Sequence, residues 1–436
     1  MKRPIQMLIG LVVIPLALVG CSKPADGGTA SSTGPAPASS TVASKGTIEL
    51  WTAWTEGKDT ATASLDMIKK FEAATGYKVN ATNFTYDQLH EKIVASAAGG
   101  NLPDVIWGLP EYVGEFYKMG ILADVSAAWN TWPDASKVPD AVKAAMTIDG
   151  KIIGFPYETT VRAYLVHDDM LSKAGVAVPK TWDDVIAVGK KVQDATGASF
   201  FGVSGTGVRA PQELLVYLAQ EGLVIAAPSG SGYKNTWNDN PDQLAKAAKV
   251  FKFYQDLIKS GAASPNSPTY GWEETDENFA TGLNATFATG NWLAEREKSN
   301  PDTMKDVSIH AIPYPADGKP ATYLESKPMM VMNTSKVLDG ATLLAQWWGS
   351  EDWQKAAFPD RSALSGVSTD SKWSKDFAAL VSTGIVYPPV TLSGITQNMI
   401  DSLAMVLQSG KTPEETAAWL STAINKSLSD SGELGS

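Results

Sequence analysis

Near the start of the folded part of the chain, three strand-like segments alternate with two segments of helical period. Residues 47–51, 78–82 and 104–107 combine β-propensity with short apolar runs and predict strands. Between them, apolar side chains over 61–71 recur at spacings of four, three and three, and 86–98 has a similar pattern, so both segments predict helices. Alternation of this kind implies βαβ units, a parallel sheet and helices on both of its faces.

The alternation resumes later in the chain. Strands are predicted for 152–156, 161–166, 285–287 and 307–312, and helices for 182–195, 245–258, 347–357 and 398–408. The last helix has a clear start, because Thr412 is a suitable N-cap, Pro413 takes the first position and Glu415 completes a capping box. Ligands of such sheets bind beyond the carboxyl ends of the strands, so the loops at 52–59 and 108–112 are candidate site loops.

The N-terminus carries an export signal. Lys2 and Arg3 precede an apolar run over 5–19, which at roughly 15 residues is too short for a membrane span and fits a signal peptide. The run ends in Leu-Val-Gly-Cys at Cys21, which resembles the lipobox of bacterial lipoproteins, whose cysteine becomes the acylated first residue of the mature chain. The alternative is an ordinary secretory signal with an incidental cysteine. Cys21 is the only cysteine, so a structural disulfide is excluded.

We therefore expect residues 1–20 to be a signal peptide and residues 21–45 to be a lipid-anchored flexible spacer. Residues 22–45 consist almost entirely of Ser, Thr, Ala, Gly and Pro, which bury too little apolar surface to fold. The remaining chain, about 390 residues, exceeds the size that one core usually supports and should form two lobes.

The charge of the chain limits its partners. The formal charge is −11, and loss of Lys2 and Arg3 with the signal peptide makes it −13. Such an acidic body repels nucleic acid and anionic lipid head groups, so we expect no nucleic acid partner and a membrane contact only through the lipid anchor. The mature chain has four arginines, which offer planar forks for fixed hydrogen bonds: Arg162, Arg209, Arg296 and Arg361.

Seven sequence blocks in a fixed order carry a resemblance that covers roughly residues 46–430. The blocks are IELWTAWTEG, KKFEAATGYKV, YDQLHEKIVASAAGGNLPDVIWG, GKIIGFPYETT, KTWDDVIAVGKKV, FATGLNATFATGNW and GKPATYLESKPMMV. Behind a lipobox, they resemble the sugar-binding, maltose-binding-protein-like family of bacterial extracellular solute-binding lipoproteins that serve ABC importers. The resemblance implies an α/β fold of two lobes, each a mostly parallel sheet flanked by helices, joined by crossing hinge segments.

The resemblance also implies where the lobes lie along the chain. Lobe one would comprise 46–157 plus 323–367 and lobe two 158–322 plus 368–436, with crossings near 156–159, 321–325 and 368. The chain departs from the family pattern after the hinge strand, where Val166-His167-Asp168-Asp169 replaces the usual Tyr-Asn-Lys-Asp. It departs again where Thr289-Gly290-Asn291-Trp292 replaces Asn-Gly-Pro-Trp, so the substrate of any one relative is not transferred.

Sugar recognition needs flat aromatic faces for C–H surfaces and fixed polar groups for hydroxyls. Among fourteen tryptophans, Trp54, Trp272 and Trp292 fall in loops that the family pattern aims at the ligand, with core or lobe-interface packing as the alternative. The other candidates come from the same loops and from the crossings: Glu56, Gly108, Glu111, Tyr157, Glu158, Arg162, Arg209, Glu273, Gly290, Asn291, Glu325, Ser326 and Arg361.

Two readings of the hinge and of its arginines stay open. Period-two alternation places Glu158, Thr160 and Arg162 on one face of a strand that leaves the first crossing, but a Glu158–Arg162 pair that only orders the hinge is the alternative. Arg162, Arg209 and Arg361 near one cleft also leave open an anionic ligand, such as a glycerophosphodiester or an acidic sugar. Neutral oligosaccharide sites use arginine too.

Enzyme motifs in the sequence are incomplete. Residues 202–206 lack the last glycine of a nucleophile elbow, and residues 410–412 lack the upstream glycine of a P-loop. His90, His167 and His310 are isolated in sequence and have no metal-ligand spacing. We expect no enzyme activity, no cofactor and no metal.

The predicted function is capture of a mono- or oligosaccharide between two lobes and its delivery to the permease subunits of an ABC importer. The protein is expected to be a monomer anchored to the outer face of the cytoplasmic membrane. A lipoprotein that senses or scaffolds at the envelope without importing anything is the alternative from another functional class.

Overall fold

The computed structural model describes residues 45–54 and 58–436. The predicted signal peptide, Cys21, the spacer to residue 44 and the candidate Glu56 lie outside these residues. In the described part of the chain, no helix is long and apolar enough to cross a membrane.

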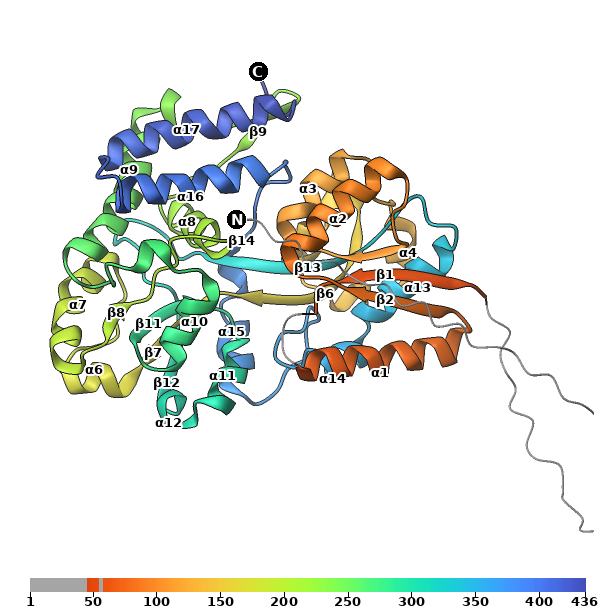
Figure 1. Ribbon diagram of the computed structural model, residues 1–436, viewed down its shortest axis with the longest axis horizontal. Coiled ribbons are helices and arrows are strands. Elements are labelled where there is room, and N and C mark those ends of the chain that lie inside the picture. Colours follow the sequence, from red (N-terminus) through yellow and green to blue (C-terminus); the bar gives the residue numbers. More distant parts are fainter. Residues whose placement is uncertain (1–44, 55–57) are drawn as a thin grey trace, which may run out of the picture. The chain divides into compact units, whose positions relative to one another are not determined.

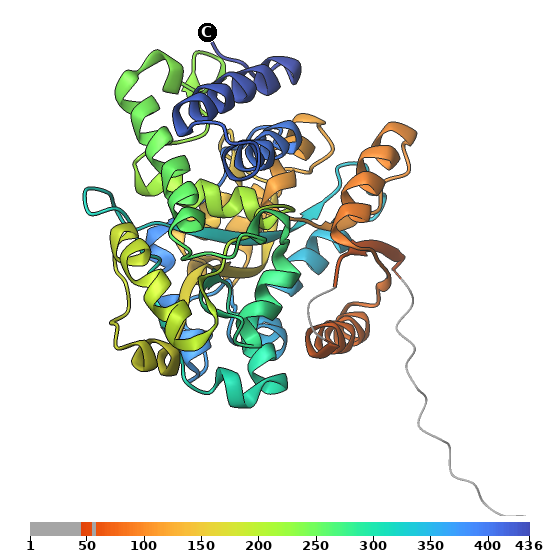
Figure 2. The same cartoon turned by 60° about the vertical axis from the view of Figure 1, so that its left-hand side comes forward.

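The first sheet has six strands. They are β1 (Thr47–Thr52), β2 (Lys78–Asn83), β3 (Val105–Trp107), β6 (Gly154–Val161), β13 (Thr322–Val331) and β14 (Gly384–Ile385). Strand β1 is parallel to its neighbours β2 and β3, as the strand–helix alternation predicts. Strand β13 runs antiparallel to β3 and β6 and parallel to β14. Helices α1 (Lys58–Thr75) and α2 (Tyr86–Gly99) lie on opposite sides of β1 and β2 (Figure 2).

The second sheet has the strand order β12-β7-β11-β8. Its strands are β7 (Ala163–His167), β8 (Ser199–Phe201), β11 (Asn284–Thr289) and β12 (Val307–His310). Strands β8 and β11 are parallel, whereas β7 is antiparallel to both of its neighbours. Two hairpins complete the strands: β4 (Thr147–Ile148) with β5 (Lys151–Ile152), and β9 (Ala227–Ser229) with β10 (Gly232–Lys234). The α/β prediction is confirmed, and both sheets contain antiparallel pairs beside the expected parallel ones.

The helices form two groups (Figure 1), and each group packs on its own hydrophobic core. The first core receives α1, α2, α3 (Pro110–Lys118), α4 (Ser126–Thr131), α5 (Asp140–Ala145), α13 (Leu338–Gly349) and α14 (Glu351–Ala357). The second core and a small cluster beside it receive α6 (Asp168–Ala174), α7 (Trp182–Thr196), α8 (Arg209–Gln220), α9 (Pro241–Lys259), α10 (Trp272–Ala280), α11 (Leu293–Ser299), α12 (Pro301–Met304), α15 (Lys372–Ala378), α16 (Ser393–Leu407) and α17 (Pro413–Asp430). Short 3-10 turns lie at η1 (Ala135–Lys137), η2 (Trp237–Asp239), η3 (Ser267–Thr269) and η4 (Val381–Thr383).

Strands β6 and β13 pass from one core to the other. Phe155 of β6 and Met330 of β13 belong to the first core, whereas Val161 and Leu324 belong to the small cluster beside the second. The two strands therefore form a two-stranded crossing between the cores (Figure 1). This is the crossing architecture expected of a two-lobe protein.

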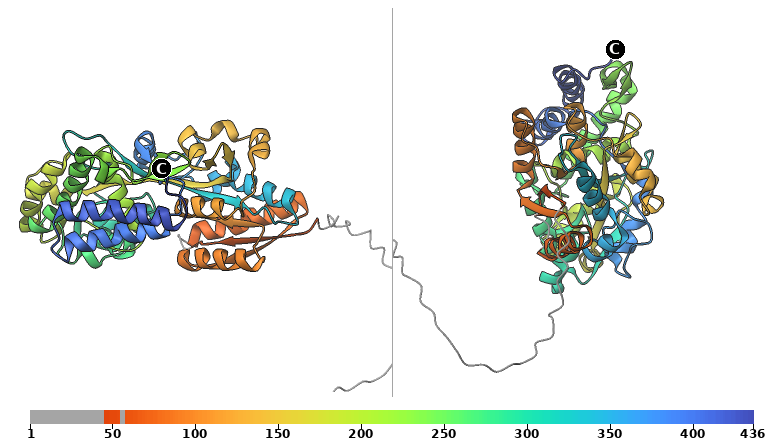
Figure 3. Two further views of the ribbon diagram at one scale, coloured as in Figure 1. Left: turned by 90° about the horizontal axis from the view of Figure 1, so that it is seen from above. Right: turned by 90° about the vertical axis from the view of Figure 1, so that its right-hand side faces the viewer.

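Local signals explain several helix boundaries. The Thr412 hydroxyl accepts from Glu415 N, and the Glu415 side chain accepts from Thr412 N, which confirms the predicted capping box of α17. Helix α17 then lies beside α16 (Figure 3). The helix predicted over 347–357 is instead two helices, because Ser350 adopts extended backbone and its hydroxyl caps α14 by accepting from Trp353 N.

Candidate functional site

The crossing strands bring buried charges of both signs together on one face. The strand register pairs Glu158 with Lys327 and Thr160 with Glu325, and Arg162 follows directly after β6. We call Glu158, Arg162, Glu325 and Lys327 the charged face of the crossing. Each of these four residues is at most 5% exposed. Glu158, Thr160 and Arg162 therefore lie on one face, as the alternation predicts. Their neighbours Lys327 and Glu325 alternate along β13 in the same way.

Ion pairs connect the charged face. Lys327 Nζ lies 2.8 Å from Glu158 Oε1 and 3.6 Å from Glu325 Oε1, and Arg162 pairs with Glu325. Arg361 Nε lies 3.3 Å from Glu158 Oε2. The alternative of a Glu158–Arg162 hinge pair is wrong, because each of the two side chains pairs with β13 instead. Every cation on the charged face has a carboxylate beside it, which offsets the cost of burial.

Gln212 of α8 connects Glu111 of α3 to Arg162 of the charged face. Arg162 Nη2 donates to Gln212 Oε1 at 2.7 Å, and Gln212 Nε2 donates to Glu111 Oε1 at 2.8 Å. The Tyr323 hydroxyl donates to the same Glu111 oxygen at 3.0 Å. Burial, followed by the negative charge of Glu325, raises the pKa of Glu111 above its usual range. One amide thus links the α3 carboxylate to the crossing arginine.

Arg209 and Trp292 form a second polar group next to Arg162. Arg209 Nη1 donates to Thr289 Oγ1 at 3.1 Å, and Trp292 Nε1 donates to Asp276 Oδ2 at 2.6 Å. The Trp292 ring centroid lies 4.6 Å from the Arg162 Cζ and 4.9 Å from the Arg209 Cζ. Burial, and then the nearby positive charge of Arg162, lowers the pKa of Arg209 to about 10. The Trp292 ring therefore makes cation–π contacts with both Arg162 and Arg209.

Trp54 and Tyr157 belong to an aromatic cluster of the first core. The Trp54 ring lies 5.8 Å from Trp348, which stacks on Trp353 at 4.0 Å. Tyr157 packs between Trp348 and Phe358, at 5.8 and 4.6 Å. Trp54 stays half-buried at the end of this cluster and keeps an indole N–H without a partner among the described residues.

Trp272 and Glu273 begin helix α10, which also carries Asp276. Trp272 is half-buried and Glu273 is exposed. Among residues 45–54 and 58–436, neither side chain has a hydrogen bond, an ion pair or a stacked ring. A half-buried indole without a hydrogen bond or a ring partner can offer its exposed part to a ligand.

Internal contacts explain the residue type at four other candidate positions: Gly108, Gly290, Asn291 and Ser326. A Cβ on Gly108 would lie 2.2 Å from Met330 Cε, and a Cβ on Gly290 would lie 1.8 Å from the Trp292 ring. The Asn291 amide accepts from Thr160 Oγ1 at 2.8 Å and donates to the Asp360 carbonyl at 2.5 Å. Ser326 Oγ accepts from Thr159 Oγ1 at 3.2 Å, away from the charged face. These contacts account for the four residues without a ligand.

The structure adds residues that the sequence reasoning missed. They are Gln212, Glu213, Asp276, Tyr323 and Lys327, all buried in or beside the site. Two patterns could have found most of them. Tyr323, Glu325 and Lys327 alternate along one strand, and Arg209, Gln212 and Glu213 share one helix face at spacings of three and four.

The raised pKa of Glu213 predicts that the stability of the fold depends on pH. Burial raises its pKa to about 8 from a usual 4.5, although the charges of Arg209 and Arg162 and hydrogen bonds from Ser204 oppose the shift. Between these pH values the folded chain keeps a proton that the unfolded chain has lost. The free energy of unfolding therefore falls as pH rises, by up to about 1.4 kcal/mol per pH unit from this group.

The matched variant is Glu213→Gln, which resembles the protonated side chain. Melting temperatures of the variant and of the natural chain should agree near pH 5, and the variant should be the more stable toward pH 8. Melting curves recorded across this range test the assignment. Curves that stay parallel from pH 5 to pH 8 would contradict it.

Comparison with known proteins places the chain in a family. The model of the bacterial extracellular solute-binding protein family matches residues 66–381. The diacetylchitobiose binding protein DasA of Streptomyces coelicolor is 23% identical over 98% of this chain and 99% of its own length. A probable ABC transporter-binding protein of Deinococcus radiodurans is 28% identical over 68% of this chain and 71% of its own length.

Solved structures share the fold. The GacH receptor of Streptomyces glaucescens, solved unliganded and with acarbose, has a TM-score of 0.74 and 21% identity over 88% of this chain and 99% of its own. A solute binding protein of Thermotoga lettingae, bound with α-D-tagatose, has a TM-score of 0.74 and 24% identity over the same shares. With the two-lobe fold and the family model in agreement, this chain belongs to the bacterial extracellular solute-binding protein family.

Proposed function

We propose that this chain captures a neutral mono- or oligosaccharide between its two lobes and delivers it to the permease subunits of an ABC importer. The observation that carries the proposal is the charged face, where each cation is already beside a carboxylate and aromatic rings lie nearby. Paired side chains of this kind offer fixed donors and acceptors to hydroxyl groups.

The carboxylates beside the cations favour a neutral ligand over an anionic one. A phosphodiester or a sugar carboxylate would compete with Glu158 and Glu325 for these cations. Arg162 pairs with Glu325, and Arg361 and Lys327 both lie beside Glu158. Arg209 lies in the field of Asp276. An incoming anion would therefore meet carboxylates as well as cations.

The relatives support a carbohydrate ligand. One is named for diacetylchitobiose, and two solved structures of the same fold hold acarbose and tagatose. We place lobe one at 46–157 plus 323–367 and lobe two at 158–322 plus 368–436. This placement is supported by the first core, whose side chains come from 48–157 and 329–367.

We propose that ligand contacts come from the charged face, Glu111, Arg209, Trp54, Trp272, Trp292 and the loop that contains Glu56. A thermal-shift panel of neutral sugars, acidic sugars and phosphodiesters on the full chain tests the function. A ligand at 100 times its dissociation constant stabilises a protein by about 2.7 kcal/mol, and we expect this from a neutral sugar. If only acidic sugars or phosphodiesters stabilise the chain, the ligand is anionic and not a neutral sugar. If no compound raises the melting temperature, the proposed function is rejected.

The family and its fold neighbours are binding proteins, and we propose that this chain likewise leaves its ligand intact. Mass spectrometry of the bound sugar after incubation tests this, since cleavage products would contradict it. Loss of sugar uptake on deletion of the gene would favour transport over an envelope scaffold that imports nothing.

We further propose that the chain acts as a monomer held to the outer face of the cytoplasmic membrane by acylation of Cys21. Cys21→Ser removes the thiol that accepts the lipid. We expect the variant to leave the membrane fraction and appear in the medium or the soluble extract. Equal membrane retention of the variant, measured by fractionation and immunoblot, would contradict acylation at this residue.

A further inference from the structure

A pocket of about 300 Å³ lies along the outer edge of β6, the edge that faces away from β13. Residues 159–161 of β6 form one wall, and the chain that runs beside them, 360–368, forms the next. Helix α5 contributes Val142, and helix α15 contributes Phe377. A space of this size holds a small organic molecule. We call it the rear pocket.

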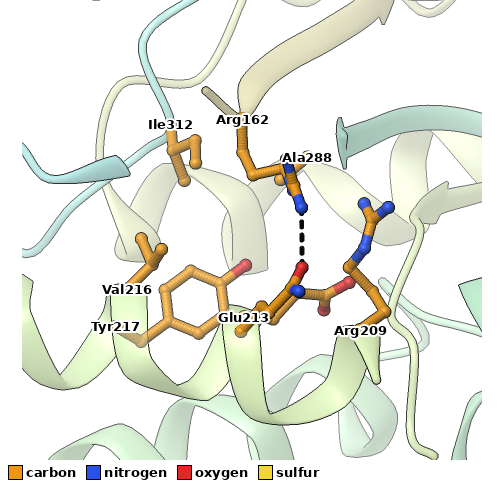
Figure 4. A pocket seen from close by; sticks show the side chains of 8 residues that line it. Arg162, Arg209, Glu213, Val216, Tyr217, Ala288 and Ile312 are labelled. Atoms are coloured by element: carbon orange, nitrogen blue, oxygen red, sulfur yellow. Dashed lines mark hydrogen bonds between the residues drawn. The ribbon is translucent and has the colours of Figure 1, made fainter. Parts of the chain in front are cut away.

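The rear pocket is separate from the charged face. Of the described residues that line it, none belongs to the charged face, and none lines the space of about 10 Å³ beside Arg162 (Figure 4). Thr159 and Val161 alternate with Glu158 and Thr160 along β6. Since neighbouring residues of a strand project to opposite sides, the rear pocket reaches the face of the crossing that lies opposite the charged face.

Side chains from both lobes form the floor of the rear pocket. Val142 and Leu364 belong to the first core, whereas Val161 and Phe377 belong to the small cluster beside the second. All four side chains are apolar and buried. A molecule on this floor would therefore contact both lobes at once.

On the side of the charged face, the two lobes already touch. Gln212 of α8 donates to Glu111 of α3 at 2.8 Å, and a Cβ on Gly114 of α3 would lie 2.5 Å from the carbonyl oxygen of Val390. A turn about β6 and β13 that separates the lobes here brings them together at the rear pocket, because the two sides of a hinge move in opposite directions. The rear pocket thus belongs to the closed arrangement of the lobes.

A carboxylate without a cation lies at the rear pocket. Asp360 is half-buried, accepts from the Thr369 hydroxyl and has no ion pair within residues 45–54 and 58–436. Arg361 also lines the pocket, but its Nε lies 3.3 Å from Glu158. An apolar floor beside such a carboxylate suits a molecule with a short hydrocarbon body and an ammonium head, since a charge-assisted hydrogen bond can form between the two charges.

We propose that the rear pocket is a second binding site, which takes a small amphiphilic amine and thereby favours closure of the lobes. The hydrocarbon body lies on Val142, Leu364 and Phe377, and the ammonium group donates to Asp360. Because a molecule that binds only the closed form raises the affinity of any other that does so, the amine and the sugar raise each other's affinity by the same factor. This coupling rests on the proposed function, whereas binding of the amine does not.

Three probes with the same six-carbon chain test the recognition of the head group. Titration calorimetry on the full chain should show hexylamine bound at one site, 1-hexanol at least about tenfold weaker, and hexanoate weaker still, because only the amine makes a charge-assisted bond to Asp360. Similar affinities for the three probes would overturn the proposed site. So would a lack of hexylamine binding.

The coupling is measured with the neutral sugar that stabilises the chain most in the thermal-shift panel. Saturating hexylamine should raise the affinity for this sugar at least about fivefold. An unchanged or lower sugar affinity would overturn the link to closure. If hexylamine binds and no sugar does, the proposed function fails and the amine site stands.

Variants at the rear pocket test the placement of the amine. Asp360→Asn should weaken hexylamine about tenfold and leave 1-hexanol unchanged. The matched control is Asp376→Asn, which removes the same charge from an exposed position of α15 outside the pocket and should change neither affinity. Ala378→Trp at the exposed mouth should block all three probes, and it serves as the test if Asp360→Asn does not fold. Equal losses of amine affinity in the two Asp→Asn variants, or full binding to Ala378→Trp, would contradict the placement.

Discussion

Replacing Lys327 by methionine should lower the free energy of unfolding by about 3 kcal/mol or more, the largest stability effect that we expect from one substitution. Lys327 is 2% exposed, and its ammonium lies between Glu158 and Glu325. Methionine keeps the length of the side chain but leaves two buried carboxylates without this cation. Arg361 and Arg162 remain beside them and limit the loss. Urea denaturation measures the change.

The matched control is Lys69→Met on the surface of α1. Lys69 Nζ lies 2.9 Å from Asp66, but the two side chains are 76% and 60% exposed. Water already solvates both charges, so the control should change the free energy of unfolding by no more than about 0.5 kcal/mol. Similar losses in the two variants would show that burial of the charged face is not what makes Lys327 important.

Replacing Trp272 by alanine should raise the dissociation constant for the sugar at least about 30-fold, the largest affinity effect that we expect. Tryptophans that meet a ligand commonly contribute about 2 kcal/mol or more to binding. Trp272 makes no hydrogen bond or ring contact within the described residues, so its removal leaves no internal group unpaired. The melting temperature of the ligand-free protein should therefore change by less than about 2 °C.

Arg209 is a poorer test of the same site. Its guanidinium is buried, donates to Thr289 and lies in the field of Asp276, so Arg209→Ala would destabilise the fold as well as the site. For Trp272→Ala, calorimetry with the sugar and a melting curve without it give separate readings. Unchanged affinity would remove Trp272 from the site, and a large drop in melting temperature would make it a packing residue.

The elements with local signals were predictable from the sequence. The capping box at Thr412 and Glu415 defines the start of α17, and apolar spacing defines α1 and α2. Strand β6 was predicted only in pieces, since 152–156 and 161–166 were separate strands and the alternation of Glu158, Thr160 and Arg162 indicated a strand that leaves the first crossing. It is one continuous strand since β13 pairs with all of its residues except Tyr157, where the register shifts. That partner lies more than 160 residues away, so no local pattern reveals it.

The candidate site was predictable as a set of residues but not as a set of contacts. Glu111, Glu158, Arg162, Arg209, Trp292, Glu325 and Arg361 do come together in one connected group. Which carboxylate pairs with which cation depends on strand register between distant segments, as with Glu158 and Lys327. Packing roles such as that of Gly290 under the Trp292 ring also depend on side-chain directions in three dimensions.

The central claim is that a sugar is held between the two lobes and draws them together about β6 and β13. Binding can drive such closure only through contacts made to both lobes. Since Cys21 is the only cysteine, a Cys21→Ser chain with cysteines introduced at the exposed Leu338 and Val224 accepts one fluorophore near each lobe. Energy transfer between the two dyes should rise on titration with the sugar and saturate at the dissociation constant found by calorimetry. Saturable sugar binding with unchanged energy transfer would contradict capture by closure.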